Sequence, residues 1–160
     1  MPQQITSASF LERLAVLEEQ VAALRRTGRE RDELPLYPTS LRSMPYEDGG
    51  TLVTVWETIL VPRTATLSLG LVMIGDQVAG TNSGGEWSVV LDDTTTVMSG
   101  TITATFSFQF ATGVIDLTPY QGLSQLKVQI KARRTSGATT GGRYGTGGAV
   151  AIAPRYAQLL

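Results

Sequence analysis

The first 28 residues carry apolar side chains at helical spacing. The apolar positions recur at intervals of four, three, four and three residues, which is the alternation of a and d positions in a heptad repeat. These positions are Phe10, Leu14, Leu17, Val21 and Leu24. Ser9 followed by Glu12 forms a capping box that starts a helix at Phe10, and Gly28 supplies its C-terminal stop. The pattern predicts a short amphipathic helix within residues 1–28.

Two arrangements would bury this apolar stripe. An isolated helix of this length is marginally stable in water, so the stripe packs either against its own β-domain or against identical copies. The strict 3.5-residue period favours self-association, and so do the flanking charges, because Arg13 at g faces Glu18 at the e position of a parallel partner. Leu11, at an e position, widens the stripe and favours three helices over two. We therefore expect a homotrimeric coiled coil.

Residues 29–50 show no sustained period and contain three prolines, which predicts an extended linker. The linker is too apolar for a free tether. Its apolar members are Leu34, Leu36, Tyr37, Leu41, Met44 and Tyr46. We expect this strap to lie along a protein surface.

From Thr51 onward the chain alternates apolar and polar residues with a period of two, which predicts β-strands. The expected strands are 51–61, 65–74, 86–91, 101–110 and 124–134, with a short strand or turn at 113–123 and a closing segment at 148–160. In the stretch 101–110 the alternation predicts one face made of Ile102, Ala104, Phe106, Phe108 and Phe110. Short strands without intervening helices predict a mainly β fold, an antiparallel, jelly-roll-like β-sandwich over residues 51–160.

Composition removes several classes of chemistry. The chain has no His and no Cys, so the usual general base, the commonest metal ligand and thiolate nucleophiles are all missing. A net charge of −1 argues against general nucleic-acid binding. No segment approaches the roughly 20 apolar residues of a membrane span. We expect no enzymatic activity, no cofactor, no metal site and no membrane insertion.

Three local patterns invite functional readings. The Gly-rich stretch 135–150 lacks the Gly-Lys-Ser/Thr of a phosphate-binding loop and precedes a strand, so a hairpin loop is expected. The acidic pairs 47–48 and 92–93 are typical of turns, and no array of calcium ligands surrounds them. Two carboxylates that meet only in space would also serve a glycoside hydrolase, and the sequence leaves that alternative open.

Aromatic residues are the candidates for a sugar-binding platform. Trp56 and Trp87 lie inside predicted strands, where core or interface packing is expected. Tyr144, among glycines, and Tyr120 are the possible sugar contacts.

Charge is unevenly distributed along the chain. Residues 44–93 carry seven acids against one base, and residues 94–160 carry six bases against one acid. Interleaved strands would mix these charges; segregated strands would let an acidic face of one copy meet a basic face of the next.

The combination of "LERLAVLEEQVAALRR", a strap and a Thr- and Gly-rich sandwich ending in strands such as "LKVQIKARRTSG" resembles small virion proteins of tailed phages infecting actinobacteria. The likeness is greatest to their minor tail and fibre-like proteins. The resemblance implies a non-enzymatic virion component, assembled in the host cytoplasm and anchored by its N-terminal region. Its partners would be identical copies, other virion proteins and, as a further candidate, host surface glycans. Capsid decoration (or head-fibre) proteins and carbohydrate-binding modules for host attachment are the alternatives.

Overall fold

The computed structural model describes residue 13 and residues 15–21, 34–35, 43–142 and 147–160. The chain divides into two compact units, Met1–Glu33 and Leu34–Leu160. In the first unit the described residues are helical, as the heptad pattern predicts. The expected ends of this helix, at Phe10 and before Gly28, lie outside the described residues.

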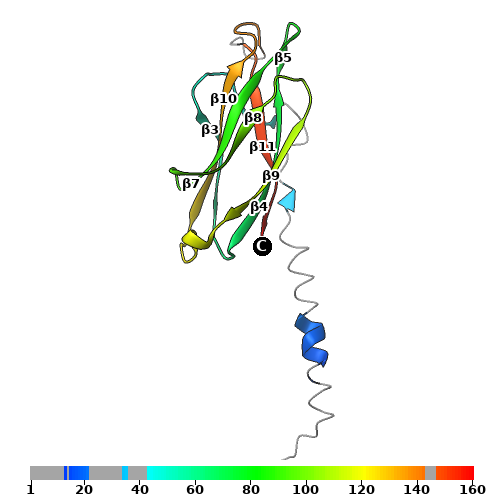
Figure 1. Cartoon of the computed structure of the whole chain (residues 1–160), viewed down its shortest axis with the longest axis vertical. Coiled ribbons are helices and arrows are strands. Elements are labelled where there is room, and N and C mark those ends of the chain that lie inside the picture. Colours follow the sequence, from blue (N-terminus) through cyan, green and yellow to red (C-terminus); the bar gives the residue numbers. More distant parts are fainter. Residues whose placement is uncertain (1–12, 14, 22–33, 36–42, 143–146) are drawn as a thin grey trace, which may run out of the picture. The chain divides into compact units, whose positions relative to one another are not determined.

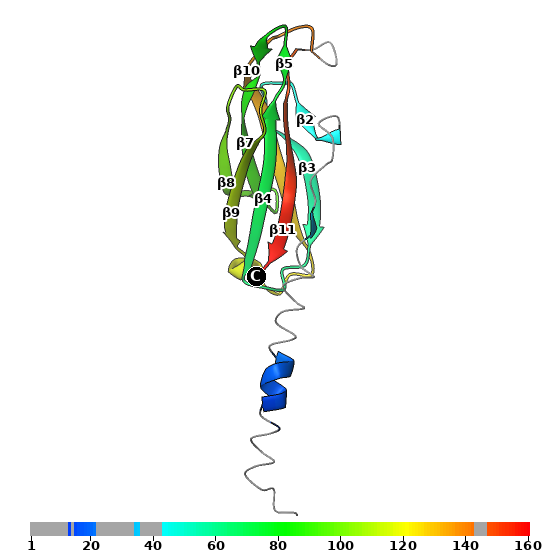
Figure 2. The same cartoon turned by 90° about the vertical axis from the view of Figure 1, so that its right-hand side faces the viewer.

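The second unit is an antiparallel β-sandwich of two main sheets (Figures 1 and 2). Sheet A contains β11 (Val150–Leu159) at its centre, beside β4 (Thr66–Gly75), with β9 (Gln109–Asp116) at one edge. Two short strands, β1 (Leu34–Pro35) and β2 (Tyr46–Glu47), pair with opposite ends of the other side of β11. Sheet B has the order β3 (Val53–Leu60), β10 (Leu126–Ser136), β7 (Gly84–Leu91) and β8 (Thr95–Ile102). A small hairpin joins β5 (Gln77–Val78) to β6 (Thr81–Asn82).

The strand pairing is nested from the outside inward. Eight strands of the two main sheets form four pairs, leaving aside β1 and the β5–β6 hairpin. The outermost pair is β2 with β11, followed inward by β3 with β10, β4 with β9 and β7 with β8. The sheets close through β4–β11 and β7–β10. A nested antiparallel ribbon wrapped into two sheets is the arrangement of a jelly roll. The predicted mainly β, jelly-roll-like sandwich therefore agrees with the observed strand order.

The core lies between the two sheets and comes from alternate positions of their strands. On β4 the inward side chains are Leu67, Leu69, Leu71 and Met73, and on β10 they are Leu126, Val128, Ile130 and Ala132. Trp87, Val89 and Leu91 of β7 and Ile115 of β9 fill the space between them. Both inward faces follow a two-residue alternation within the segments 65–74 and 124–134, which were predicted as strands.

The end of the strap covers part of the outer face of sheet A. Met44 is buried against Val72, Ile74 and Ala153, which point away from the main core. The backbone N–H of Ile152 donates to the carbonyl of Pro45 at 3.0 Å. Residues 44 and 45 of the expected strap therefore contact the outer face of the protein's own sandwich, and residues 36–42 lie outside the described residues.

The prediction of one strand over residues 101–110 is wrong. β8 ends at Ile102, residues 103–108 form an irregular crossing from sheet B to sheet A, and β9 begins at Gln109. The Gln109 side chain closes this crossing, since its Nε2 donates to the carbonyl of Thr103 and its Oε1 accepts from the N–H of Thr103. Ile102 is buried, whereas Phe106, Phe108 and Phe110 are exposed.

Residues 75–85, which lie between two of the expected strands, contain the β5–β6 hairpin. The segment 113–123, expected as a short strand or turn, completes β9 and then forms a 3-10 turn, Thr118–Tyr120. Within the part of the chain that the structure describes, no helix has the length and apolar character needed to cross a membrane.

Candidate assembly surfaces

The described part of the N-terminal helix exposes apolar side chains. Leu17 is 56% exposed and Val21 is 46% exposed, and their four-residue separation places them on one helical face. Val16, which is 51% exposed, lies about 100° away around the helix, at a c position. The other three predicted seam residues, Phe10, Leu14 and Leu24, lie outside the described residues. Leu17 and Val21 therefore form the described part of the expected seam, called here the helix stripe.

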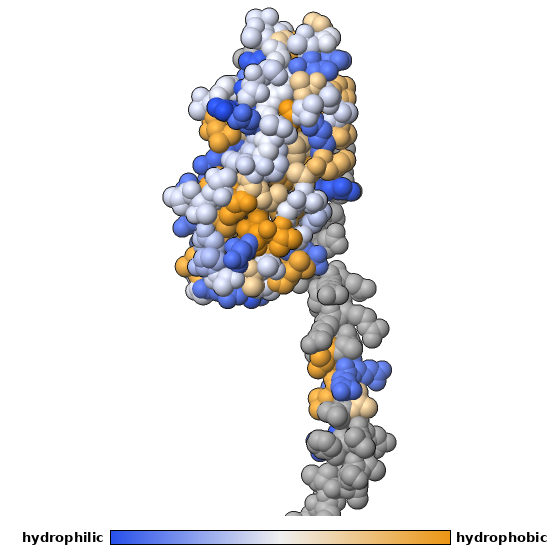
Figure 3. All heavy atoms as spheres, in the orientation of Figure 1, coloured by the Kyte–Doolittle hydropathy of each residue, from blue (hydrophilic) through white to orange (hydrophobic). Residues whose placement is uncertain are grey.

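A second apolar surface lies on β9 and the crossing that precedes it. Phe110 and Val114 point outward from sheet A and are 58% and 67% exposed, while Phe106 and Phe108 are exposed in the crossing. The Arg155 guanidinium lies 4.8 Å from the centre of the Phe110 ring, a cation–π contact across the outer face of sheet A. We call Phe106, Phe108, Phe110 and Val114 the β9 surface. Figure 3 shows apolar side chains gathered on the side of the sandwich where Figure 1 draws β8 and β9 toward the viewer.

The sequence contained a signal for this surface that the strand prediction overlooked. Ile115 on β9 is buried, and Leu117 directly after it is buried too. Side chains an odd number of residues apart face opposite sides of a regular strand. Ile115 and Phe110 are five residues apart, so an inward Ile115 forces Phe110 outward. Ile102 lies eight residues before Phe110, so in one continuous strand both side chains would face the same side. Ile102 is buried and Phe110 is exposed, and this conflict marks the break between the two strands.

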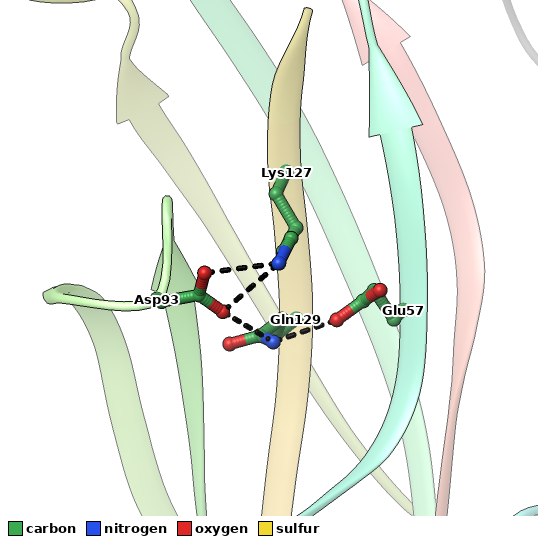
Figure 4. Close-up of polar contacts among 4 residues, drawn as sticks. All are labelled: Glu57, Asp93, Lys127 and Gln129. Carbon is green, nitrogen blue, oxygen red and sulfur yellow. Dashed lines mark hydrogen bonds and ion pairs between the residues drawn. The ribbon is translucent and has the colours of Figure 1, made fainter.

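A polar network ties three strands of sheet B together (Figure 4). Asp93, in the turn between β7 and β8, accepts a hydrogen bond from Lys127 Nζ at 2.9 Å and one from Gln129 Nε2 at 2.8 Å. The same Nε2 atom donates to Glu57 Oε2 on β3 at 2.7 Å. Gln129 is only 5% exposed, and its Oε1 has no hydrogen-bond partner among the described residues.

The electrostatics of this network are those of a structural ion pair. The hydrogen bond from Lys127 is the main cause of a lowered pKa at Asp93, and Asp93 in turn raises the pKa of Lys127. A glycosidase that works through a pair of carboxyl groups needs one of them as an acid with a raised pKa. Asp93 is shifted in the opposite direction. The network therefore joins β3, β10 and the β7–β8 turn. A lowered pKa does not favour Asp93 as a general acid.

The uneven charge along the sequence is mixed by the fold. Nested pairing places the late strand β10 between the early strands β3 and β7. Arg133 on β10 pairs with Glu86 on β7 at 2.6 Å, and Lys127 pairs with Asp93. Of the two arrangements considered from the sequence, the interleaved one is observed in sheet B.

The two acidic pairs, at 47–48 and 92–93, lie at turns. Asp92 and Asp93 have positive φ angles of 48° and 64° in the β7–β8 turn, as expected of turn-forming acids. Glu47 Oε1 accepts a hydrogen bond from the N–H of Gly49 at 2.6 Å, which closes a second turn. Among the described residues, no group of three or more His, Cys, Asp or Glu side chains is placed to hold a metal ion.

The described aromatic candidates pack against the core. Trp87 is buried in the core and Trp56 packs against it, so the packing prediction is confirmed for both tryptophans. Tyr120 is partly buried against the core at the end of the 3-10 turn. Tyr144 lies outside the described residues, so its predicted sugar contact has no structural counterpart to compare.

Comparison with known proteins gives no family. No protein-family model matches the chain, and no curated protein matches it. One solved structure with a similar chain is described as "Structure of infectious bursal disease virus Gt strain". The match covers 78% of this chain and 29% of the other, at 18% identity and a TM-score of 0.36, a value too low to establish a shared fold.

Proposed function

We propose that the chain is a non-enzymatic structural protein of a virion, a minor tail or fibre-like component that self-associates through its N-terminal helix and displays the sandwich. The observation that carries the proposal is the jelly-roll strand order joined to a helix with an exposed apolar stripe. Jelly rolls occur in viral capsid proteins and in lectins. The step from this fold to a virion is therefore an argument by analogy, which the experiments below test.

The helix supports the self-association part of the proposal. Leu17 and Val21 repeat the spacing of a heptad seam and remain exposed in a single copy. Three parallel helices would cover them, with Arg13 and Glu18 at the flanking g and e positions. The helix is too short for a fibre shaft, so its role is to register copies about an axis and to anchor them on a larger particle.

The sandwich supports the absence of catalysis. The chain has no His or Cys, and the carboxylates of Glu57 and Asp93 both accept hydrogen bonds from the Gln129 amide, which gives both of them a structural partner. We therefore assign the sandwich to display and bracing.

Incorporation into particles tests the proposal. Full-length protein and a version lacking residues 1–33 are supplied to cells that assemble the particles, and copies per particle are counted by quantitative mass spectrometry. The cut follows the boundary between the two compact units and keeps Met44 and β2 on the sandwich. We expect the full chain to be incorporated and the shortened chain to be excluded.

Labelled antibody then locates the incorporated protein. A few copies at the tail support the minor tail assignment. Many copies over the head would assign the chain to the capsid decoration class, which needs the same parts. Equal incorporation of both versions would place the docking surface on the sandwich and refute anchoring by the helix.

A further inference from the structure

The outer edges of the sandwich differ in how they are protected from pairing with other strands. Natural sheets protect their edges with short strands, bulges or charged residues. β1 and β2 have two residues each. β3 carries Glu57 and has a register irregularity against β10, and β8 has one against β7. β9 has none of these: its eight residues pair with β4 without a register shift, and its one charged residue, Asp116, comes last.

The sequence of β9 is complementary to itself. When a strand pairs antiparallel with its own copy about a two-fold axis at Thr112, residue pairs sum to 224, so Phe110 lies opposite Val114 of the second copy. These are the two most exposed apolar side chains on β9, and both lie on the outer face. On the inner side the small residues Ala111 and Gly113 face each other. Asp116 lies opposite position 108, so no like charges are opposed.

The exposed apolar area of the β9 surface is large enough to supply about half of a standard protein–protein interface. Half of three phenylalanine side chains and two thirds of a valine amount to roughly 400 Å² of apolar surface per copy. A standard interface buries about 800 Å² per partner. The backbone of the added strand and its flanking polar residues would supply the remainder.

We propose that the β9 edge is a second self-association surface, on which two copies join sheet A to sheet A through antiparallel β9–β9 pairing centred on Thr112. The pairing itself does not depend on the helix. The overall strength of the contact rests on the proposed function, because copies joined by their helices would present several β9 edges at once. Several weak β9–β9 contacts would then act together.

Single cysteine substitutions test this register, because the chain has no cysteine of its own. In a two-fold pair centred on residue 112 the two Cα atoms of that residue lie about 4.5–5.5 Å apart, within reach of a disulfide. Full-length Thr112→Cys, oxidised gently, should run mainly as a disulfide-linked dimer without reductant. Thr54→Cys, also exposed but on the β3 edge, is the matched control and should remain unlinked. Absence of the Thr112→Cys dimer, or equal linking of both variants, would overturn the proposal.

A second variant separates this contact from the helix. Val114→Asp changes an exposed side chain and should fold normally, yet it places a charge opposite Phe110 of the second copy. The double variant Thr112→Cys/Val114→Asp should lose the disulfide-linked dimer while keeping the oligomer mass set by the helix. If the wild type is a monomer in dilute solution but Thr112→Cys still links at higher concentration, helical self-association fails and the β9 contact stands. A double variant that links as fully as Thr112→Cys alone would overturn the β9 contact.

Discussion

Charge placed in the helix stripe should dissociate the protein, and charge placed beside it should not. The test variant is Leu17→Asp/Val21→Asp, and the matched control is Val16→Asp. All three side chains are about half exposed in the single copy, so none of these changes removes a buried contact within the described structure. They differ in their heptad position, since Leu17 is at d, Val21 at a and Val16 at c.

The magnitude follows from the surface that self-association would cover. Covering the exposed half of Leu17 and of Val21 removes apolar area worth roughly 1 kcal/mol for each side chain. In a trimer the six side chains together contribute roughly 6 kcal/mol, which is about four orders of magnitude in the association constant. Asp removes that contribution and adds the cost of an unpaired charge in the seam. Val16→Asp changes a side chain that stays in water, and its effect should be within about 0.5 kcal/mol.

Light scattering coupled to gel filtration measures the outcome. Wild type and Val16→Asp should give the same oligomer mass, and the double variant should give a smaller species at the same concentration. Circular dichroism of the three proteins checks that the sandwich remains folded. If all three have the same mass, or if Val16→Asp dissociates as fully as the double variant, the assignment of the helix stripe to a seam is refuted.

Three further predictions concern the sandwich. Gly70→Ala should destabilise it by about 1–3 kcal/mol, because the new methyl group would overlap the Tyr156 ring; the same change in a Tyr156→Ala background should be close to neutral in denaturant unfolding. Asp93→Asn keeps a residue suited to the left-handed turn but removes the ion pair with Lys127. Because the folded-state pKa of Asp93 is lowered from 3.8, its stabilisation is present above that pH and is lost as pH falls below it. The variant should therefore be less stable than wild type at neutral pH and converge with it in acid, and an unchanged difference across this range would contradict the assignment. Met44→Ala should lower the free energy of unfolding by about 2–4 kcal/mol, since Met44 fills the outer cluster on sheet A; an unchanged denaturation midpoint would show that the strap adds nothing to the fold.

The alternation of apolar and polar residues predicted those strands whose two faces differ in environment. On β10 the inward residues are apolar and their neighbours are polar or charged, and in the first half of β4 the inward leucines alternate with Ser68 and Gly70, so the phase of these strands is visible in the sequence. The same rule failed over 101–110, where Phe residues alternate with Ser, Thr and Gln although the chain crosses between sheets. Aromatic residues that serve an exposed surface follow the same two-residue period as core residues. Only the conflict of phase between Ile102 and Ile115 distinguishes the two cases.

The pairing of strands was beyond a local reading of the sequence. The three outer nested pairs join segments far apart in the chain, such as Tyr46 with Ala151, and no residue pattern specifies such a partner. The polar network around Gln129 was invisible for the same reason, because Glu57, Asp93 and Gln129 meet only after β10 has entered between β3 and β7. Acidic turns were predicted from composition; the partners of the acids required the fold.

The two proposed contacts have different symmetries, and together they restrict which assemblies the chain can form. A parallel helix seam groups copies around one axis and closes on itself, whereas a β9–β9 contact is isologous and joins copies in pairs. With a three-helix seam, each β9–β9 pair links copies that belong to different trimers. Where the two-fold axis crosses the trimer axis at a right angle, two trimers face each other and the assembly closes at six copies. A closed particle of six copies suits a tail component present in small number. Open linkage of trimers would extend into a lattice, which is the geometry of a shell covering. The direction of the two-fold axis relative to the helix axis therefore decides between the tail and decoration assignments on physical grounds, and the mass of the cross-linked Thr112→Cys assembly reports it: six copies for the closed case, and species growing with concentration for the open one.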